Sequence, residues 1–159
     1  MGFEEITGRR VALRPLHERD VEVIEGWLDE ASRAAGPSYP LGANRALVIE
    51  RMSEEGAIGL FEYAVRDGWI RVSFIALAKA YRGWGYGSEA VRLLEEWALG
   101  EGRAEHFRAE VPVGNGLGLY FWLRLGYRPA KRDEFEWRGE GERDRMTMVR
   151  VLGDVGSRK

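Results

Sequence analysis

The amino-acid sequence predicts an α/β (α+β) domain in which a mostly antiparallel sheet is flanked by helices. One observation is a series of strand-like segments, two of them joined by Asp67-Gly68, a dipeptide typical of tight hairpins. Another is a glycine-rich stretch at 83–87, between a predicted strand and the most regular amphipathic helix of the chain. A strand follows that helix, so strand, loop, helix and strand make one crossover unit.

The spacing of apolar residues places the elements of the first half. Val11 and Leu13 predict a short strand that ends at Pro15, and Asp20 suits the N-cap of a helix over 20–30. The segment 36–42, with Tyr39 in it, has too many glycines and prolines for a regular element and indicates a loop. Further strands are predicted at 46–52, 57–65 and 69–78, the first two joined by a turn at 53–56.

The second half carries two helices around one strand. Apolar residues share one face of a helix over 88–99, a strand is predicted at 106–111, and a second helix over 117–125 is closed by Gly126. Eleven of the fifteen residues 131–145 are charged, yet their alternation with Phe135 and Trp137 indicates a solvated edge strand that could pair with 146–152. We therefore expect one domain over 1–152 and a frayed tail at 153–159.

Composition excludes several classes of function. The chain of 159 residues has no cysteine and two histidines, so we expect no thiol nucleophile, no disulfide framework and no metal site. A formal net charge of −2 gives no basic field for nucleic acid or anionic lipid. Neither a membrane-spanning apolar stretch nor an apolar signal core occurs, which predicts a cytoplasmic protein with a small partner and leaves a homodimer open.

The segment 82–88 predicts an anion site. It precedes a helix, so unpaired backbone N–H groups and the positive end of the helix dipole converge on it, and Arg82 adds a positive charge. A plain glycine-rich turn is the alternative. Residues 85–90 also satisfy the dinucleotide spacing G-x-G-x-x-A, but only about seventy residues follow, too few for that fold. The nucleoside triphosphate motif G-x-x-x-x-G-K-[ST] is absent from the sequence.

The same segment resembles the acetyl-CoA loop of the GNAT N-acetyltransferase superfamily. The family pattern [RQ]-x-x-G-x-[GA] is filled by Arg82, Gly85 and Gly87. A second signature follows in the right order: Asn115 and the helix that leads to Gly126-Tyr127 are similar to N-x-x-A-x-x-x-[YW]-x-x-x-G-[FY]. Residues 11–16 more weakly resemble the opening strand of several members. Two spaced motifs are more specific than either alone.

The resemblance implies a splayed mixed sheet that holds the pantetheine arm of acetyl-CoA between its fourth and fifth strands. Leu77 would offer backbone groups to pantetheine, and Asn115 would lie beside it or cap the last helix. The expected cofactor-binding residues also include Trp122 and the loop residues Arg82, Gly83, Trp84, Gly85, Tyr86, Gly87 and Ser88. The partners implied are acetyl-CoA and an amine acceptor.

Glu110 is the leading candidate for a general base, because it lies on the predicted strand at 106–111 and points away from the face of Phe107 and Val111. A solvated strand glutamate is the alternative. Glu62 and Ser73 are weaker candidates of the same kind. Tyr39 is a candidate for lining an acceptor pocket, with an ordinary loop aromatic as the alternative. His17 and His106 are expected at the ends of elements without a catalytic role.

Many members of the resembled family have a tyrosine four residues before the glycine of the closing G-[FY], as a general acid. Here Trp122 holds that position, and its indole N–H cannot serve as an acid. Tyr120, about 200° away around the helix, is not expected to replace it. We therefore expect direct acetyl transfer to a primary amine in which the base matters more than the acid, with an inactive coenzyme A or nucleotide sensor of the same fold as the alternative.

Overall fold

The computed structural model describes residues 4–28, 45–112, 114–130 and 145–151. Its helices are α1 (Glu18–Trp27), α3 (Tyr86–Gly100) and α4 (Gly116–Arg124), with a short 3₁₀ turn η1 (Lys79–Tyr81). Its strands are β1 (Ile6–Thr7), β2 (Val11–Pro15), β3 (Arg45–Arg51), β4 (Gly59–Arg66), β5 (Trp69–Leu77), β6 (His106–Pro112), β7 (Arg128–Pro129) and β8 (Arg145–Val151).

The strands form one mixed, mostly antiparallel sheet in the order β1-β2-β3-β4-β5-β6-β8-β7. Strands β1 to β5 pair antiparallel in sequence order, β6 pairs parallel to β5, and β8 lies antiparallel between β6 and β7. Asp67 and Gly68 have φ of +52° and +81°, as a tight hairpin turn requires. The predicted hairpin and crossover unit are confirmed.

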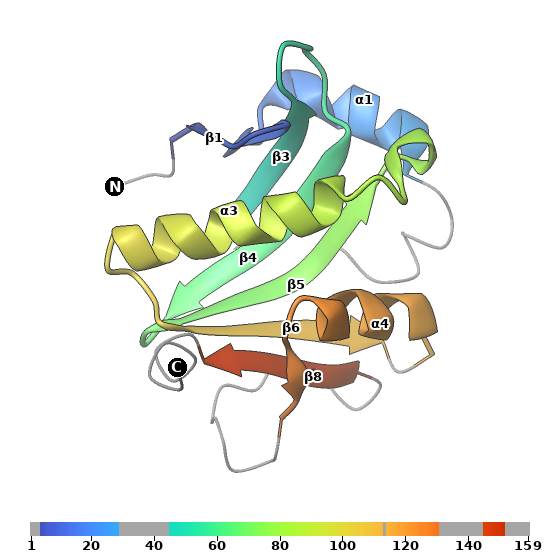
Figure 1. Ribbon diagram of the computed structural model, residues 1–159. Helices are drawn as coiled ribbons and strands as arrows, with labels where there is room; N and C mark the ends of the chain where they lie inside the picture. The colour runs from blue at the N-terminus through green and yellow to red at the C-terminus, as the bar shows by residue number, and fades with distance from the viewer. Residues whose placement is uncertain (1–3, 29–44, 113, 131–144, 152–159) are drawn as a thin grey trace.

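Helices cover both faces of the sheet. Figure 1 shows α3 and α4 in front of it and α1 behind it. The larger core lies under α3 and α4, where Phe61 and Phe107 contribute from the strands and Leu94 from α3. A smaller core lies under α1, where Ile24 packs with Leu60 and Phe74. Strands β4 and β5 are thus covered on both faces.

Helix α1 begins earlier than the sequence predicts. It starts at Glu18 after His17, so the expected N-cap role of Asp20 is wrong. Asp20 instead lies in the first turn, where its carboxylate accepts from the backbone N–H of His17 at 2.8 Å and from both terminal nitrogens of Arg14, each at 2.8 Å. The Arg14 guanidinium keeps the pKa of Asp20 below its usual range despite burial. Asp20 is thus the N3 residue of a capping box with His17 and also ties the first turn of the helix to β2.

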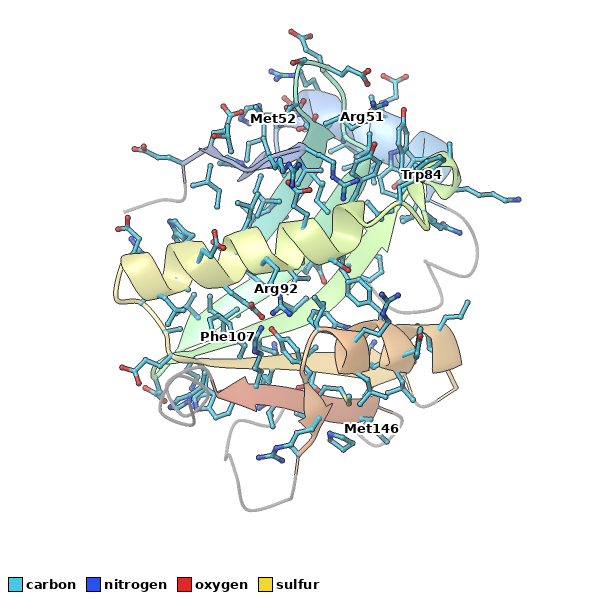
Figure 2. All side chains as sticks on the ribbon, viewed as in Figure 1. Arg51, Met52, Trp84, Arg92, Phe107 and Met146 are labelled. Carbon is cyan, nitrogen blue, oxygen red and sulfur yellow. The ribbon has the colours of Figure 1, made fainter. Side chains whose placement is uncertain are left out.

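Glu95 ties α3 to the C-terminal part of the sheet. Its carboxylate accepts from the Tyr127 hydroxyl at 2.6 Å, from Arg92 at 2.9 Å and from Arg150 on β8 at 2.9 Å. Arg92 also donates to the carbonyl of Leu125, just after α4, at 2.9 Å. Figure 2 shows Arg92 between α3 and α4. Burial raises the pKa of Glu95 although these donors oppose the shift.

Three of the sequence-based expectations lie outside the described residues. This holds for the predicted edge strand around Phe135 and Trp137, for the tail at 153–159, and for the loop that contains Tyr39. The domain limits 1–152 stay a prediction. Strand β8 pairs with β6 over its whole length, from Arg145 opposite Pro112 to Val151 opposite His106, which the sequence did not indicate.

Candidate active site

The site is built on a gap between two neighbouring strands. The parallel pairing of β5 and β6 runs from Trp69 opposite His106 to Val72 opposite Ala109 and ends there, although both strands continue. Figure 1 shows the two strands diverging toward their carboxyl ends. Beyond the last pair, the edges that face each other carry peptide groups that a ligand can bind. A cavity of about 630 Å³ occupies this gap.

The cavity is lined by three parts of the chain. They are the second half of β5 with the end of β6, the glycine loop with the first turn of α3, and α4. Among the expected site residues the lining includes Glu110, Leu77, Arg82, Gly83, Gly85, Gly87, Ser88, Asn115 and Trp122, together with Ser73.

The glycine loop owes its shape to two left-handed residues. Gly83 has φ +81° and Gly85, the N-cap of α3, has φ +89°, conformations that L side chains rarely adopt. Gly87 lies against the opposite wall, because a Cβ there would be 3.3 Å from Phe121 of α4. The amides of the first turn of α3 have no partner within the helix, so the loop presents backbone donors beside the cavity.

Arg82 and Leu77 contact each other at the loop. The Nε of Arg82 donates to the carbonyl oxygen of Leu77 at 2.9 Å, and both residues line the cavity. The Leu77 carbonyl therefore already has a partner from this chain, which the sequence did not predict. The contact holds an exposed guanidinium at the cavity rim, where it adds positive charge near the helix N-terminus.

Two of the expected cofactor-binding residues, Trp84 and Tyr86, are not among those that line the cavity. The Trp84 side chain is 66% exposed, and Figure 2 shows it at the outer end of the loop. The Tyr86 ring instead stacks with the guanidinium of Arg10 at 4.8 Å. The aromatic side chains of the loop therefore lie outside the cavity, whereas Arg82 lines it.

Asn115 caps α4. Its Oδ1 accepts from the backbone N–H of Gly118 at 2.9 Å, and a Cβ on Gly118 would collide with the Asn115 amide. Of the two roles that the resemblance implied, the cap is observed, and the residue also lines the cavity.

Glu110 lies in the cavity wall and is 7% exposed. Its Oε2 accepts from the guanidinium of Arg108, with the Nε at 2.7 Å, and its Oε1 accepts from the Thr147 hydroxyl at 2.9 Å. Arg108 is fully buried. The sequence reasoning missed both partners. Arg108 could have been found as the residue two positions earlier on the same strand face, whereas Thr147 depends on the pairing of β6 with β8.

Trp122 and Tyr120 both line the cavity, and whether Tyr120 can replace a general acid at the Trp122 position stays a prediction. Phe121 lies between them and lines the cavity as well, which means that α4 borders it over a wide arc. Trp122 is buried and packs edge-on against Phe121 and Tyr127, with ring centroids 5.1 and 4.8 Å away. Tyr120 is 59% exposed, so its hydroxyl is the more accessible group.

The weaker candidates differ in their positions. Ser73 lines the cavity, and its hydroxyl lies 3.5 Å from the carboxylate of Glu62, which is buried beside it on β4. His17 is the N-cap residue of α1 and His106 begins β6, so both lie at element ends as predicted. Within the described ranges, no cluster of three or more His, Cys, Asp or Glu side chains could hold a metal ion.

A gap between β5 and β6 that leads to a glycine-rich loop at the N-terminus of α3 is the arrangement that the resemblance implied. The Acetyltransferase (GNAT) family model matches residues 11–127, from β2 to the end of the segment after α4. The chain belongs to this family. The matched region contains Glu110, the glycine loop and the cap of α4.

Among relatives, this GNAT protein is 27% identical over 119 residues to an uncharacterized N-acetyltransferase, YobR, of Bacillus subtilis. The match covers 69% of this chain and 48% of the relative, so the chain spans about half of that protein's length. The GNAT fold is also found in solved structures. An acetyltransferase from Agrobacterium tumefaciens superposes with a TM-score of 0.73 at 18% identity, covering 94% of this chain and 95% of that one. An acetyltransferase from Salmonella typhimurium that modifies the N-terminal serine of a ribosomal protein superposes with a TM-score of 0.69 at 13% identity, covering 91% and 96%.

The family assignment rests on residues 11–127 of this chain. In the part of the chain that the structure describes, none of the helices is long and apolar enough to cross a membrane.

Proposed function

We propose that this protein transfers an acetyl group from acetyl-CoA directly to a primary amine, with release of the coenzyme A thiol. The observation that carries the proposal is the cavity between β5 and β6, which opens where their pairing ends at Val72 and Ala109 and leads to the N-terminus of α3. An extended arm with amide groups fits such a gap, and a pyrophosphate fits the helix end.

The residues present suit acetyl-CoA. Gly83 and Gly85 give the loop its left-handed turns, so that backbone groups of the loop line the cavity where the pyrophosphate would lie, and Arg82 adds a cation at the rim. The free edges of β5 and β6 offer peptide groups to pantetheine in the manner of an added strand. When bound, acetyl-CoA supplies an activated acetyl thioester.

Glu110 is the proposed general base. It lines the cavity, and a carboxylate oxygen has two lone pairs, so Oε1 can accept a second hydrogen bond beside that of Thr147. Through this second hydrogen bond, Oε1 would accept the proton of the acceptor amine, directly or through a water. Arg108 and Thr147 hold the carboxylate in one orientation, which favours transfer in a defined geometry.

The free-energy cost of removing this proton indicates which class of amine is the easier acceptor. A lysine amine with a pKa of about 10.4 needs roughly 4.6 kcal/mol to be neutral at pH 7, whereas an α-amine near pKa 7.8 needs about 1 kcal/mol. Because the base is a single carboxylate, an α-amine is the easier acceptor. The similar fold of an enzyme that modifies an N-terminal serine adds a peptide α-amine to the panel that should be tried first.

A second candidate is a coenzyme A or nucleotide sensor of the same fold that has lost turnover. The buried Trp122 at the acid position and the ion pair of Glu110 with Arg108 favour it. Release of free thiol from acetyl-CoA, measured against a panel of peptides, lysine analogues and polyamines, separates the two. A transferase releases thiol with at least one amine in the panel, and a sensor binds coenzyme A without release.

A further inference from the structure

Arg10 reaches the glycine loop from outside the cavity. It lies just before β2, and its Nη1 donates to the carbonyl of Trp84, 74 positions later in the chain, at 2.9 Å. Its Nε donates to Oε1 of Glu89 in the first turns of α3, also at 2.9 Å. One guanidinium therefore contacts the loop and the helix that follows it. Arg10 belongs to neither of the motifs that the sequence analysis singled out.

The carboxylate of Glu89 also contacts the backbone at the start of β2. Oε2 of Glu89 accepts from the backbone N–H of Arg10 at 2.7 Å and from that of Val11 at 3.4 Å. Partial burial would raise the pKa of Glu89, but the backbone N–H and guanidinium of Arg10 outweigh burial, so the pKa lies below its usual value. Glu89 is thus a charged carboxylate that joins the start of β2 to the start of α3.

Arg10 also fills the outer side of the left-handed turn. Its guanidinium lies 4.8 Å from the ring centre of Tyr86, the first residue of α3. A Cβ on Gly85 would come within 3.0 Å of its Nη2. The inner side of Gly85 lines the cavity, so Arg10 supports this turn from the face opposite to the ligand.

The charge of Glu89 matters for an anion at this helix end. A carboxylate in the first turns of α3 competes with a bound pyrophosphate for the positive end of the helix dipole and repels it. The Nε of Arg10 lies 2.9 Å from Oε1 of Glu89, so its positive charge compensates the carboxylate and the ion pair holds the two segments together. Loss of Arg10 would leave the anion site with a displaced loop and an uncompensated negative charge.

We propose that Arg10 is a positioning residue for the acetyl donor: it fixes the Trp84 carbonyl and neutralises Glu89, and so keeps the loop amides oriented toward the pyrophosphate. This role rests on the proposed function. Arg10 does not line the cavity, so it acts through the loop and not on the reacting atoms.

The test compares Arg10→Ala with Arg9→Ala, which removes the same charge from the exposed neighbouring position. Calorimetric titration with coenzyme A and steady-state thiol release are measured for both and for the unmodified protein. We expect Arg10→Ala to raise the Kd for coenzyme A and the KM for acetyl-CoA about tenfold, which corresponds to about 1.4 kcal/mol, with kcat at saturating donor within about twofold of the parent. Arg9→Ala should leave all three values unchanged.

Two further variants separate position from charge. Arg10→Lys can neutralise Glu89 or hold the Trp84 carbonyl but not both, so its Kd should fall between those of the parent and Arg10→Ala. Adding Glu89→Gln to Arg10→Ala removes the uncompensated charge and should recover part of the affinity. A Kd for Arg10→Lys equal to that of the parent would overturn the role of the two contacts, and this variant keeps the test valid if Arg10→Ala does not fold.

The outcomes distinguish this role from the proposed function. If the unmodified protein neither binds coenzyme A nor releases thiol with any amine, the proposed function fails. If it binds coenzyme A and Arg10→Ala binds it equally well, or if Arg10→Ala lowers kcat with Kd unchanged, the function stands and the role of Arg10 is wrong.

Discussion

The hydroxyl of Thr147 on β8 donates a hydrogen bond to Oε1 of Glu110 on β6, at 2.9 Å. The two residues lie directly opposite each other in the antiparallel register of these strands. Arg108, two residues before Glu110 on the same strand face, holds the other carboxylate oxygen. The proposed base is therefore oriented by groups from two strands and cannot rotate freely in the cavity.

Replacing Glu110 by glutamine should remove the proposed base while keeping the shape of the side chain. On the best acceptor found, we expect kcat/KM to fall about 100-fold near neutral pH and less at high pH, where more of the amine is already neutral. The measurement is kcat/KM against pH for the parent and the variant. Thr147→Val is the comparison variant: it removes an orienting hydroxyl and leaves the carboxylate, so kcat/KM should fall less than for Glu110→Gln. A Glu110→Gln variant with parental activity would exclude Glu110 as the base.

Tyr120→Phe tests whether the exposed hydroxyl at the cavity acts as an acid. We expect a loss of less than about threefold in kcat/KM, because a thiol with a pKa near 8.5, taking cysteine as its analogue, leaves readily as the thiolate. The assay is thiol release at saturating donor, in parallel with Glu110→Gln. A large loss for Tyr120→Phe together with a nearly silent Glu110→Gln would assign the chemistry to the tyrosine.

Thermal unfolding should distinguish the ligands that the glycine loop accepts. A ligand at 100 times its Kd stabilises the folded state by about 2.7 kcal/mol, which raises the Tm of a domain of this size by about 5 °C or more. We expect this shift with acetyl-CoA and none with NADH or ATP, because neither of the latter has a pantetheine arm that could enter the gap between β5 and β6. An equal shift with NADH would support a dinucleotide site instead.

Gly85→Val should weaken donor binding far more than it harms folding. Valine disfavours the φ of +89°, and its Cβ would meet Arg10 at 3.0 Å, so the loop must move away from the geometry that faces the pyrophosphate. The helix core lies further along α3 and stays packed. Gly100→Val, at the other end of the same helix where a Cβ meets nothing within 4 Å, is the control. Coenzyme A affinity by calorimetry should fall more than tenfold for Gly85→Val alone.

The ion pair of Asp20 with Arg14 should make stability depend on pH in acid. The pKa of Asp20 is lowered in the folded state, so the unfolded state binds more protons and stability falls as the pH drops below about 4. Asp20→Asn should cost about 3 kcal/mol at pH 7 and show a shallower loss between pH 4 and 2 than the parent. Urea unfolding at several pH values measures both. Glu18→Gln, at an exposed position in the same turn, should match the parent.

The parts that could be predicted from the sequence are those with local causes. Asp67-Gly68 determines its hairpin through its own backbone preferences, and the apolar face of α3 follows from spacing alone. The glycine loop was found for the same reason. The glycines and the start of the helix that follows them lie within the seven consecutive residues 82–88, so the anion site could be predicted from local sequence.

Contacts between distant segments could not be predicted. Thr147 reaches Glu110 only because β8 is inserted between β6 and β7, and Arg10 reaches Trp84 across 74 positions. That Tyr120 lines the cavity together with Trp122 could not be predicted either, because helical geometry gives the angle between the two residues but not the width of the cavity that α4 borders. Asp20 looked like a cap because the sequence does not show that Arg14 lies beside it.

The short seam between β5 and β6 divides the sheet into two blades, one built from β1–β5 and the other from β6, β8 and β7. Glu95 on α3 spans this division through Tyr127 and Arg150, and Arg92 spans it through the Leu125 carbonyl. Apolar surfaces can slide over one another, whereas these bonds have fixed lengths and directions. These hydrogen bonds fix the distance between the two parts of the sheet, so the cavity between β5 and β6 has its width before a ligand binds. Binding then carries no free-energy cost for opening the cavity.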